Sequence, residues 1–143
     1  MKAITVHQPW AWAIIHAGKD IENRSWNWGG TGELAIHAGK TWDPYGEVFM
    51  LRLGIHVPSD DLVSGAIIGV VNVTGVHHAN RCTEQFGLPS PKRCSQWATP
   101  MSYHWKLDRP RPIEPISCRG KQQLWNVPED AEALIRKQLE VTR

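Results

Sequence analysis

Three charged side chains, Lys19, Glu22 and Arg24, lie within six residues of one another. Glu22 and Arg24 are two residues apart on a segment predicted to be a strand, so they share one face. A carboxylate acceptor beside a planar guanidinium donor suits the edge of a nucleobase, and a phosphate or acyl carbonyl would favour the guanidinium or the Lys19 ammonium. Strict alternation of side chains along the strand puts Lys19 on the opposite face. A turn at Gly18 must therefore redirect Lys19 if the three side chains are to converge. A structural row of ion pairs explains the spacing equally well.

The chain has eight tryptophans, which can either fill a core or stack a base. Trp10 falls on the apolar stripe of a predicted helix and Trp105 on a predicted strand, so both are expected to be structural. Trp26 and Trp28 come just before a glycine turn and are the better candidates for an exposed platform.

The cysteines and histidines give a weak metal signal. His77, His78, Cys82 and Cys94 can be assembled on paper into four ligands. Structural zinc sites usually take paired ligands from tight knuckles, however, and only one such cluster is present. We therefore predict no metal and no cofactor. The three cysteines contain no CxxC pair, which argues against a disulfide framework and fits a reducing compartment.

Hydrophobic periodicity predicts alternating strands and helices. Strands are expected at residues 2–6, 20–26, 32–39, 65–78, 103–107 and 122–127, and helices from Pro9 to Gly18, over 44–54 and over 128–140. The last helix should bury Ala131, Leu134, Ile135 and Leu139. The glycines within 65–78 indicate a strand bent around a closed sheet. The basic segment 106–121 is either a solvated connection between strands or a rim that follows phosphates.

Length and composition favour one globular domain over residues 1–143, since 41% of the residues are hydrophobic and 21% charged. No stretch is long and apolar enough to cross a bilayer, and no secretory signal is recognised, so a cytoplasmic protein is expected. The net charge of +2 permits a nucleic-acid partner without demanding one. We expect a monomer or a weak dimer.

Residues Ala17–Arg24 resemble the motif GxKxxExR of the ASCH family, with Ala17 in place of the first glycine. Further matches are HQPWAW at 7–12, IHAGK at 36–40, GAIIG at 65–69, YHWKL at 103–107 and RGKQQLW at 119–125. The resemblance covers nearly the whole chain. It implies an α+β fold: a PUA-like mixed β-barrel with short peripheral helices and a C-terminal helix.

Members of the ASCH family have been linked to RNA or DNA binding, to ribonuclease activity and to N4-acylcytidine deacylation, so three hypotheses stand. The first is a pocket that binds single-stranded RNA or a modified nucleoside or nucleotide, and it ranks first because no nucleophile and base pair is recognisable. Its candidate contact residues are Gln8, Lys19, Glu22, Arg24, Trp26, His37, Lys40 and Arg119. His37 and Lys40 are included because their segment resembles a second block of the family.

The two other hypotheses are hydrolytic, with Lys19 and Glu22 as the catalytic residues. An amidohydrolase would use Glu22 as the base and Lys19 as its electrostatic partner, with Arg24 or a backbone N–H stabilising the oxyanion. In the deacylase subgroup a threonine occupies the position of Glu22, so this chain departs from that pattern. A ribonuclease would use Lys19 and Glu22 on the ribose 2′-hydroxyl, with His37 or Lys40 at the phosphate.

Overall fold

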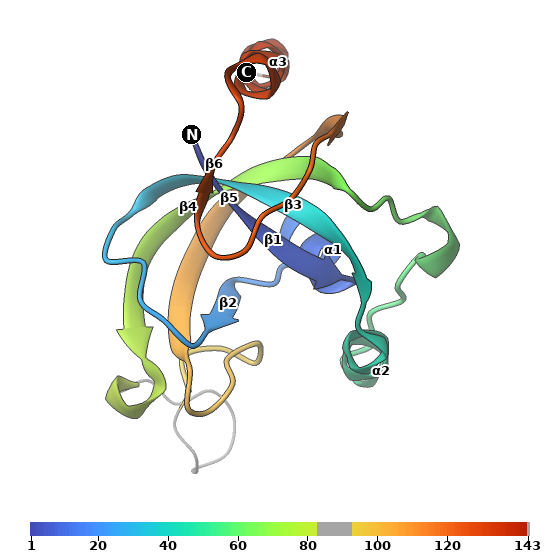
Figure 1. Cartoon of the computed structure of the whole chain (residues 1–143). Coiled ribbons are helices and arrows are strands. Elements are labelled where there is room, and N and C mark those ends of the chain that lie inside the picture. The colour runs from blue at the N-terminus through green and yellow to red at the C-terminus, as the bar shows by residue number, and fades with distance from the viewer. Residues whose placement is uncertain (83–92, 143) are drawn as a thin grey trace.

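A computed structural model of the chain describes residues 1–82 and 93–142, and it contains one curved six-stranded sheet in the order β2-β5-β4-β3-β1-β6 (Figure 1). The strands are β1 Lys2–Gln8, β2 Ile21–Arg24, β3 Gly32–Trp42, β4 Ala66–His78, β5 Tyr103–Ser117 and β6 Trp125–Asn126. The helices are α1 Trp10–His16, α2 Pro44–Arg52 and α3 Glu129–Val141, with short 3-10 turns η1 Ser59–Asp61 and η2 Ala79–Arg81. β1 and β3 are parallel, and the other neighbouring strands are antiparallel. None of the helices described is long and apolar enough to span a membrane.

Helices pack on both faces of the central strands, which therefore carry nearly continuous apolar runs. On one face, side chains such as Ile4 and Ile36 pack with Ile14 of α1. On the other face, Ala35 and Val70 pack with Ile135 of α3. Of the four residues expected to be buried on the C-terminal helix, Ala131 and Ile135 are buried and Leu139 packs against them, but the prediction for Leu134 is wrong because that side chain is 52% exposed.

The α+β class is confirmed, but the closed barrel is not, because β2 and β6 are free edges of the sheet. All four residues of β2 pair with β5, and among the residues described β2 does not pair with β1. A side chain spans the remaining gap: Nη2 of Arg24 donates to the carbonyl oxygen of Thr5 on β1 at 2.9 Å. The sheet still curves strongly, and its register shifts at Gly69 and Gly75 of β4 are the bends that the sequence indicated.

The segment expected to connect two strands is instead most of one long strand, β5. β2 covers only Tyr103–Lys106, so further along β5 has a single hydrogen-bonded neighbour, β4. Prolines are tolerated on such an edge because their missing N–H faces no partner strand. Arg111, which was counted toward a phosphate rim, donates instead to Glu33 at 3.0 Å and to Asn72 at 2.9 Å. The last predicted strand, 122–127, is reduced to Trp125–Asn126.

Glu33 joins the sheet to α3, since it accepts hydrogen bonds from Arg111 at 3.0 Å and from Arg136 at 2.5 Å. Burial alone would raise the pKa of Glu33, but the bonds from Arg136 and Arg111 outweigh it and lower that pKa. A carboxyl with a lowered folded-state pKa contributes stability above its ordinary pKa, about 4.3, and that contribution is lost as the pH falls.

We therefore expect Glu33→Gln to lower Tm by about 1–3 °C at pH 7, because a partly exposed network contributes roughly 1 kcal/mol or less. The difference from the wild type should shrink as the pH falls below 4. Thermal melts between pH 3 and 7 measure this, with the exposed Glu140→Gln on the same helix as the control. A Tm difference that does not change with pH would contradict the assignment.

Candidate functional site

Lys19, Glu22 and Arg24 converge. Nζ of Lys19 lies 3.7 Å from Oε1 of Glu22, and Nη2 of Arg24 lies 3.4 Å from Oε2 of the same carboxylate. The Lys19 and Glu22 side chains are 3% and 8% exposed, and that of Arg24 is 22% exposed. The carboxylate is therefore held between two cations, with the guanidinium on the more open side.

The turn between α1 and β2 explains how Lys19 reaches this group. Gly18 has a φ of +72°, which a residue with a side chain rarely adopts, and the Lys19 N–H donates back to the Ala13 carbonyl at 3.1 Å. β2 begins only at Ile21, so strand alternation does not apply to Lys19. Nζ of Lys19 also donates to the carbonyl oxygen of Ile21, which holds the ammonium beside β2.

Burial lowers the pKa of Lys19, and the positive charge of Arg24 acts in the same direction, while Glu22 and Asp20 oppose the shift. The ammonium also lies 5.8 Å from the centre of the Trp10 ring, within reach of a cation–π interaction. Lys19 is therefore a lysine in a dry environment whose neutral form is stabilised relative to a lysine in water.

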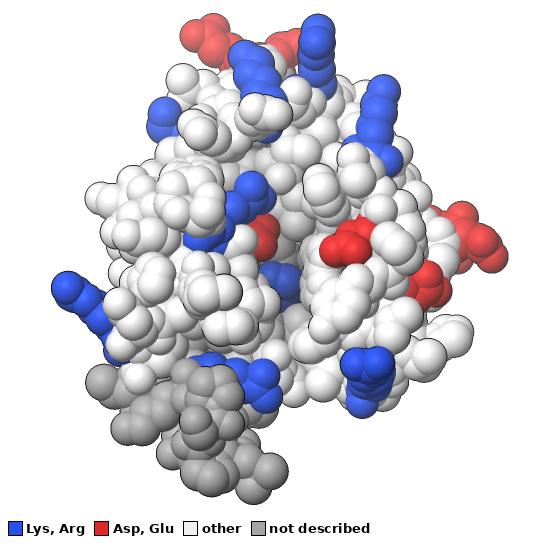
Figure 2. All heavy atoms as spheres, turned by 60° about the horizontal axis from the view of Figure 1, so that its bottom comes forward, with Lys and Arg blue, Asp and Glu red and all other residues white. Residues whose placement is uncertain are grey.

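The three charged residues line a cavity of about 510 Å³. Figure 2 shows this face hollowed near its middle, with basic and acidic side chains together at the hollow. Aromatic side chains form much of its wall: Trp10, Phe49 and Trp97 pack on one another with ring centres 5.6, 5.7 and 6.5 Å apart. Sequence reasoning missed Trp97 and Phe49, because they come from segments far from the motif along the chain.

The loop 93–102 supplies one side of this cavity and is anchored to β2 and the turn before it. Nδ2 of Asn23 donates to the Trp97 carbonyl at 2.8 Å, and Oδ1 accepts from the Thr99 N–H at 2.9 Å. Oγ of Ser95 donates to Asp20 at 2.5 Å. Asp20 and Asn23, two of the variable positions of the motif, thus position the wall that faces its charged residues.

His37, Lys40 and Arg119 line a different cavity, of about 770 Å³. Lys40, Arg119 and Lys121 are exposed around it, and His37 is buried. Nε2 of His37 lies 2.6 Å from the carbonyl oxygen of Cys118, and burial lowers the pKa of His37 against the effect of that bond. The chain folds closely over the ring: a Cβ on Gly120 would lie 2.6 Å from Cε1 of His37.

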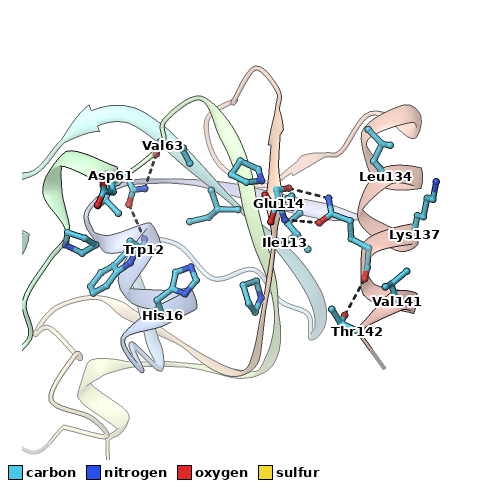
Figure 3. Close-up of a pocket in the computed structure, with 17 residues that line it drawn as sticks. Trp12, His16, Asp61, Val63, Ile113, Glu114, Leu134, Lys137, Val141 and Thr142 are labelled. Carbon is cyan, nitrogen blue, oxygen red and sulfur yellow. Dashed lines mark hydrogen bonds between the residues drawn. The ribbon is translucent and has the colours of Figure 1, made fainter.

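Gln8 and Trp26 lie apart from both groups. Gln8 is buried, and its side chain accepts a hydrogen bond from the Trp12 N–H and donates one to the Val63 carbonyl, each at 2.9 Å. It lines an open groove of about 960 Å³ (Figure 3). Trp12 and His16 of α1 line one side of this groove, and Leu134 and Val141 of α3 line the other.

Trp26 is half-buried and packs edge-on against Trp105 with ring centres 4.9 Å apart. Trp28 is also half-buried and stacks on Trp105 at 5.7 Å. Trp105 is fully buried, as predicted. The two candidates for an exposed platform thus cover a core residue.

A model of the ASCH domain family matches residues 4–117, which includes the whole motif, most of β1 and all of β2 to β5. The chain belongs to the ASCH family. No curated protein sequence matches it significantly.

Crystal structures of the ASCH protein from Zymomonas mobilis are similar in fold. One point mutant has 15% identity and a TM-score of 0.57, covering 98% of this chain and 96% of its own. The unmutated protein has 15% identity and a TM-score of 0.57, and the match covers 95% of this chain and 93% of its own. A second mutant has 14% identity and a TM-score of 0.54, and the match covers 98% of this chain and 94% of its own. At these identities the likeness concerns the fold alone.

Membership of the ASCH family gives the motif residues a common context. ASCH domains are in general associated with nucleic acids, and RNA-binding and hydrolase roles both fall within the family. In this ASCH domain the motif brings its lysine, glutamate and arginine to one cavity, whereas the basic residues of the later segments surround another. The choice of function therefore depends on what these two cavities can bind.

Proposed function

We propose that the chain binds a nucleobase, from single-stranded RNA or from a modified nucleoside or nucleotide, in the cavity lined by Lys19, Glu22 and Arg24. The observation that carries this is the convergence of the three charges beneath an aromatic wall. The cavity volume of about 510 Å³ falls in the range of small-molecule sites, roughly 300–1,000 Å³.

The chemistry of the cavity matches the edge of a base. Glu22 can accept from an exocyclic amine or a ring N–H, and the more exposed Arg24 can donate to a carbonyl or ring nitrogen. The Trp10 ring at the wall offers an apolar surface for the base, and base–aromatic stacking is worth roughly 1–3 kcal/mol. Because the charges are already paired with one another, a ligand must replace those contacts with equally good ones, which favours selectivity over high affinity.

Isothermal titration calorimetry with short single-stranded RNAs, the matching duplex, free cytidine and N4-acetylcytidine tests this proposal. We expect single-stranded RNA or a nucleoside to bind and the duplex to bind more weakly, because paired bases cannot enter the cavity. Equal affinity for the duplex, or no binding of any of these ligands, would overturn the proposal.

The basic residues around the second cavity suit the phosphates of a strand whose base occupies the first. Lys40, Arg119 and Lys121 are exposed there, and no acidic residue lines that cavity among the residues described. Lys40→Ala and Arg119→Ala should each weaken RNA binding and reduce the log–log salt slope by about 0.7, the value for one phosphate contact on a single strand.

The exposed Lys2→Ala is the matched control for these variants. Titration of a fluorescent oligonucleotide at several salt concentrations gives the slopes. If Lys2→Ala changes the slope as much as the other two variants, the basic residues act only through net charge, and the phosphate contact is excluded. Free-nucleoside binding should be unchanged in all three.

The burial of Lys19 favours one hydrolytic alternative, N4-acylcytidine amidohydrolysis. A lysine with a lowered pKa can take a proton from water, whose oxygen attacks the acyl carbonyl. The proton then passes to the amide nitrogen as the C–N bond breaks, giving cytidine and a carboxylate. Arg24 lies on the open side of Glu22, where it can stabilise the oxyanion. The ribonuclease arrangement is less well supported, because His37 and Lys40 line a different cavity from Lys19 and Glu22.

A further inference from the structure

Four side chains with metal-binding atoms meet at one end of the sheet. The imidazoles of His77 and His104 and the thiols of Cys82 and Cys94 place one nitrogen or sulfur atom each within 4.8 Å of all the others. His77 lies on β4 and His104 is its cross-strand partner on β5. Cys82 directly follows η2, and Cys94 is in the loop that precedes β5. His104 is buried and the other three are half-buried.

Four of the six distances between these atoms are close to the edges of a tetrahedron around zinc, and the other two are no longer than 4.8 Å. Nε2 of His77 and Nδ1 of His104 are 3.3 Å apart. The sulfur of Cys82 lies 3.2 Å from the first nitrogen and 3.3 Å from the second, and the sulfur of Cys94 lies 3.4 Å from the second. With Zn–N near 2.0 Å and Zn–S near 2.3 Å, regular tetrahedral edges are about 3.3 Å between nitrogens and about 3.5 Å between nitrogen and sulfur.

The hydrogen bonding of His104 directs a lone pair at the same point. Its Nε2 lies 2.7 Å from the Thr99 carbonyl oxygen, which can only accept, so the proton of a neutral ring resides on Nε2. Nδ1 then presents its lone pair to Cys82, Cys94 and His77. A backbone carbonyl holding the far nitrogen in this way is the usual outer contact of a histidine that binds a metal.

Strand geometry also explains why the sequence did not predict this set. His77 and His78 are consecutive on β4, so their side chains point to opposite faces of the sheet. The His78 ring packs against Tyr103, at 5.0 Å, while His77 faces His104. The fourth ligand therefore comes from residue 104 and not from the neighbouring histidine.

We propose that His77, Cys82, Cys94 and His104 bind one structural Zn²⁺ ion. All four tetrahedral positions would be filled by protein, which leaves none for water or substrate and makes the ion structural. It would tie the end of β4 to the start of β5 and to Cys94. Cys94 lies at the start of the loop whose Trp97 and Thr99 line the cavity of Lys19, Glu22 and Arg24, so the ion would hold that wall in addition to its hydrogen bonds with Asn23.

The third cysteine provides a matched control, because Cys118 is half-buried but lies beside the second cavity and outside this cluster. The full chain is purified with zinc in the medium, dialysed, and analysed for metal by mass spectrometry. We expect about one zinc per chain in the wild type and in Cys118→Ser, and less than about a fifth of that in Cys82→Ser and Cys94→Ser. Loss of zinc from all three variants alike, or its absence from the wild type, would overturn the proposal.

Cobalt substitution tests the geometry without depending on the folding of a variant. Metal-free wild-type protein, with reduced thiols and circular dichroism like that of the metal-bound form, is titrated with Co²⁺. We expect intense d–d bands and a thiolate-to-cobalt charge-transfer band that saturate at one equivalent and disappear when Zn²⁺ is added. Weak octahedral bands without charge transfer would exclude a site with two thiolates. We also expect removal of zinc to lower Tm by several degrees, because a metal that binds only the folded state stabilises it.

Discussion

Replacing Arg24 with alanine is expected to weaken nucleobase binding about 10- to 100-fold. The guanidinium is the most exposed of the three converging charges, so it meets the ligand first. A charge-assisted hydrogen bond is worth roughly 1.5–3 kcal/mol. The variant also loses the donor to the Thr5 carbonyl that links β2 to β1, so we expect a small loss of stability, about 1 kcal/mol. Calorimetry gives the affinity, and urea unfolding gives the stability.

Arg24→Lys separates the charge of this arginine from its planar geometry. A lysine keeps the positive charge but cannot present the planar fork that reads two acceptors at once, so it should recover only part of the affinity. Arg52→Ala, an exposed arginine on α2 outside the cavity lining, should bind like the wild type. If Arg24→Ala instead unfolds several kcal/mol more easily and binds normally at low temperature, the arginine serves the sheet and not the ligand.

The motif singled out Lys19, Glu22 and Arg24 as candidates, and the structure shows how they converge. Spacing alone placed Glu22 and Arg24 on one face, because side-chain alternation on a strand is a local property. Lys19 could not be placed that way, since its position depends on the positive φ of Gly18 and on where β2 begins. The aromatic wall was not predictable, because Phe49 and Trp97 reach the cavity only through tertiary packing.

The errors in the prediction of the fold have a similar origin. Gly69 and Gly75 correctly indicated a bent sheet, but closure requires the edge strands β2 and β6 to pair, and such long-range pairing is not visible in local sequence patterns. The segment 106–121 was expected to connect strands or to follow phosphates, but its prolines fit a strand, because β2 covers only the start of β5. The metal ligands show the same limit: His104 joins His77 through cross-strand pairing, which no sequence spacing reveals.

The sequence suggested Glu22 as the base of any deacylation, with Lys19 as its partner, because an adjacent carboxylate favours the ammonium form. That argument assumed an open, wet pocket. In the structure the Lys19 side chain is 3% exposed, and burial is the main cause of its lowered pKa. The condition under which desolvation outweighs the carboxylate is therefore met, and the order of roles that we now expect is reversed.

If N4-acetylcytidine is hydrolysed, we expect Lys19→Arg to lower kcat/KM by about 10²- to 10⁴-fold, the usual contribution of a general base, because arginine cannot lose its proton. Glu22→Gln should keep a measurable fraction of the activity. In the wild type kcat/KM should rise with pH and level off below the ordinary lysine pKa of about 10.4, since burial lowers the pKa of Lys19. Chromatographic measurement of cytidine release between pH 6 and 10 gives kcat/KM for the variants and its pH dependence in the wild type.

A rate that is flat over this pH range, with an inactive Glu22→Gln and an active Lys19→Arg, would return the role of base to the Glu22 carboxylate. Absence of hydrolysis in wild-type protein that binds the nucleoside would leave the site as a recognition pocket. Lys19→Met distinguishes these cases further, because it keeps most of the volume of a side chain that is 3% exposed but removes both the base and the charge. It should abolish hydrolysis by a lysine base, and a recognition pocket should lose no more than about 100-fold in affinity.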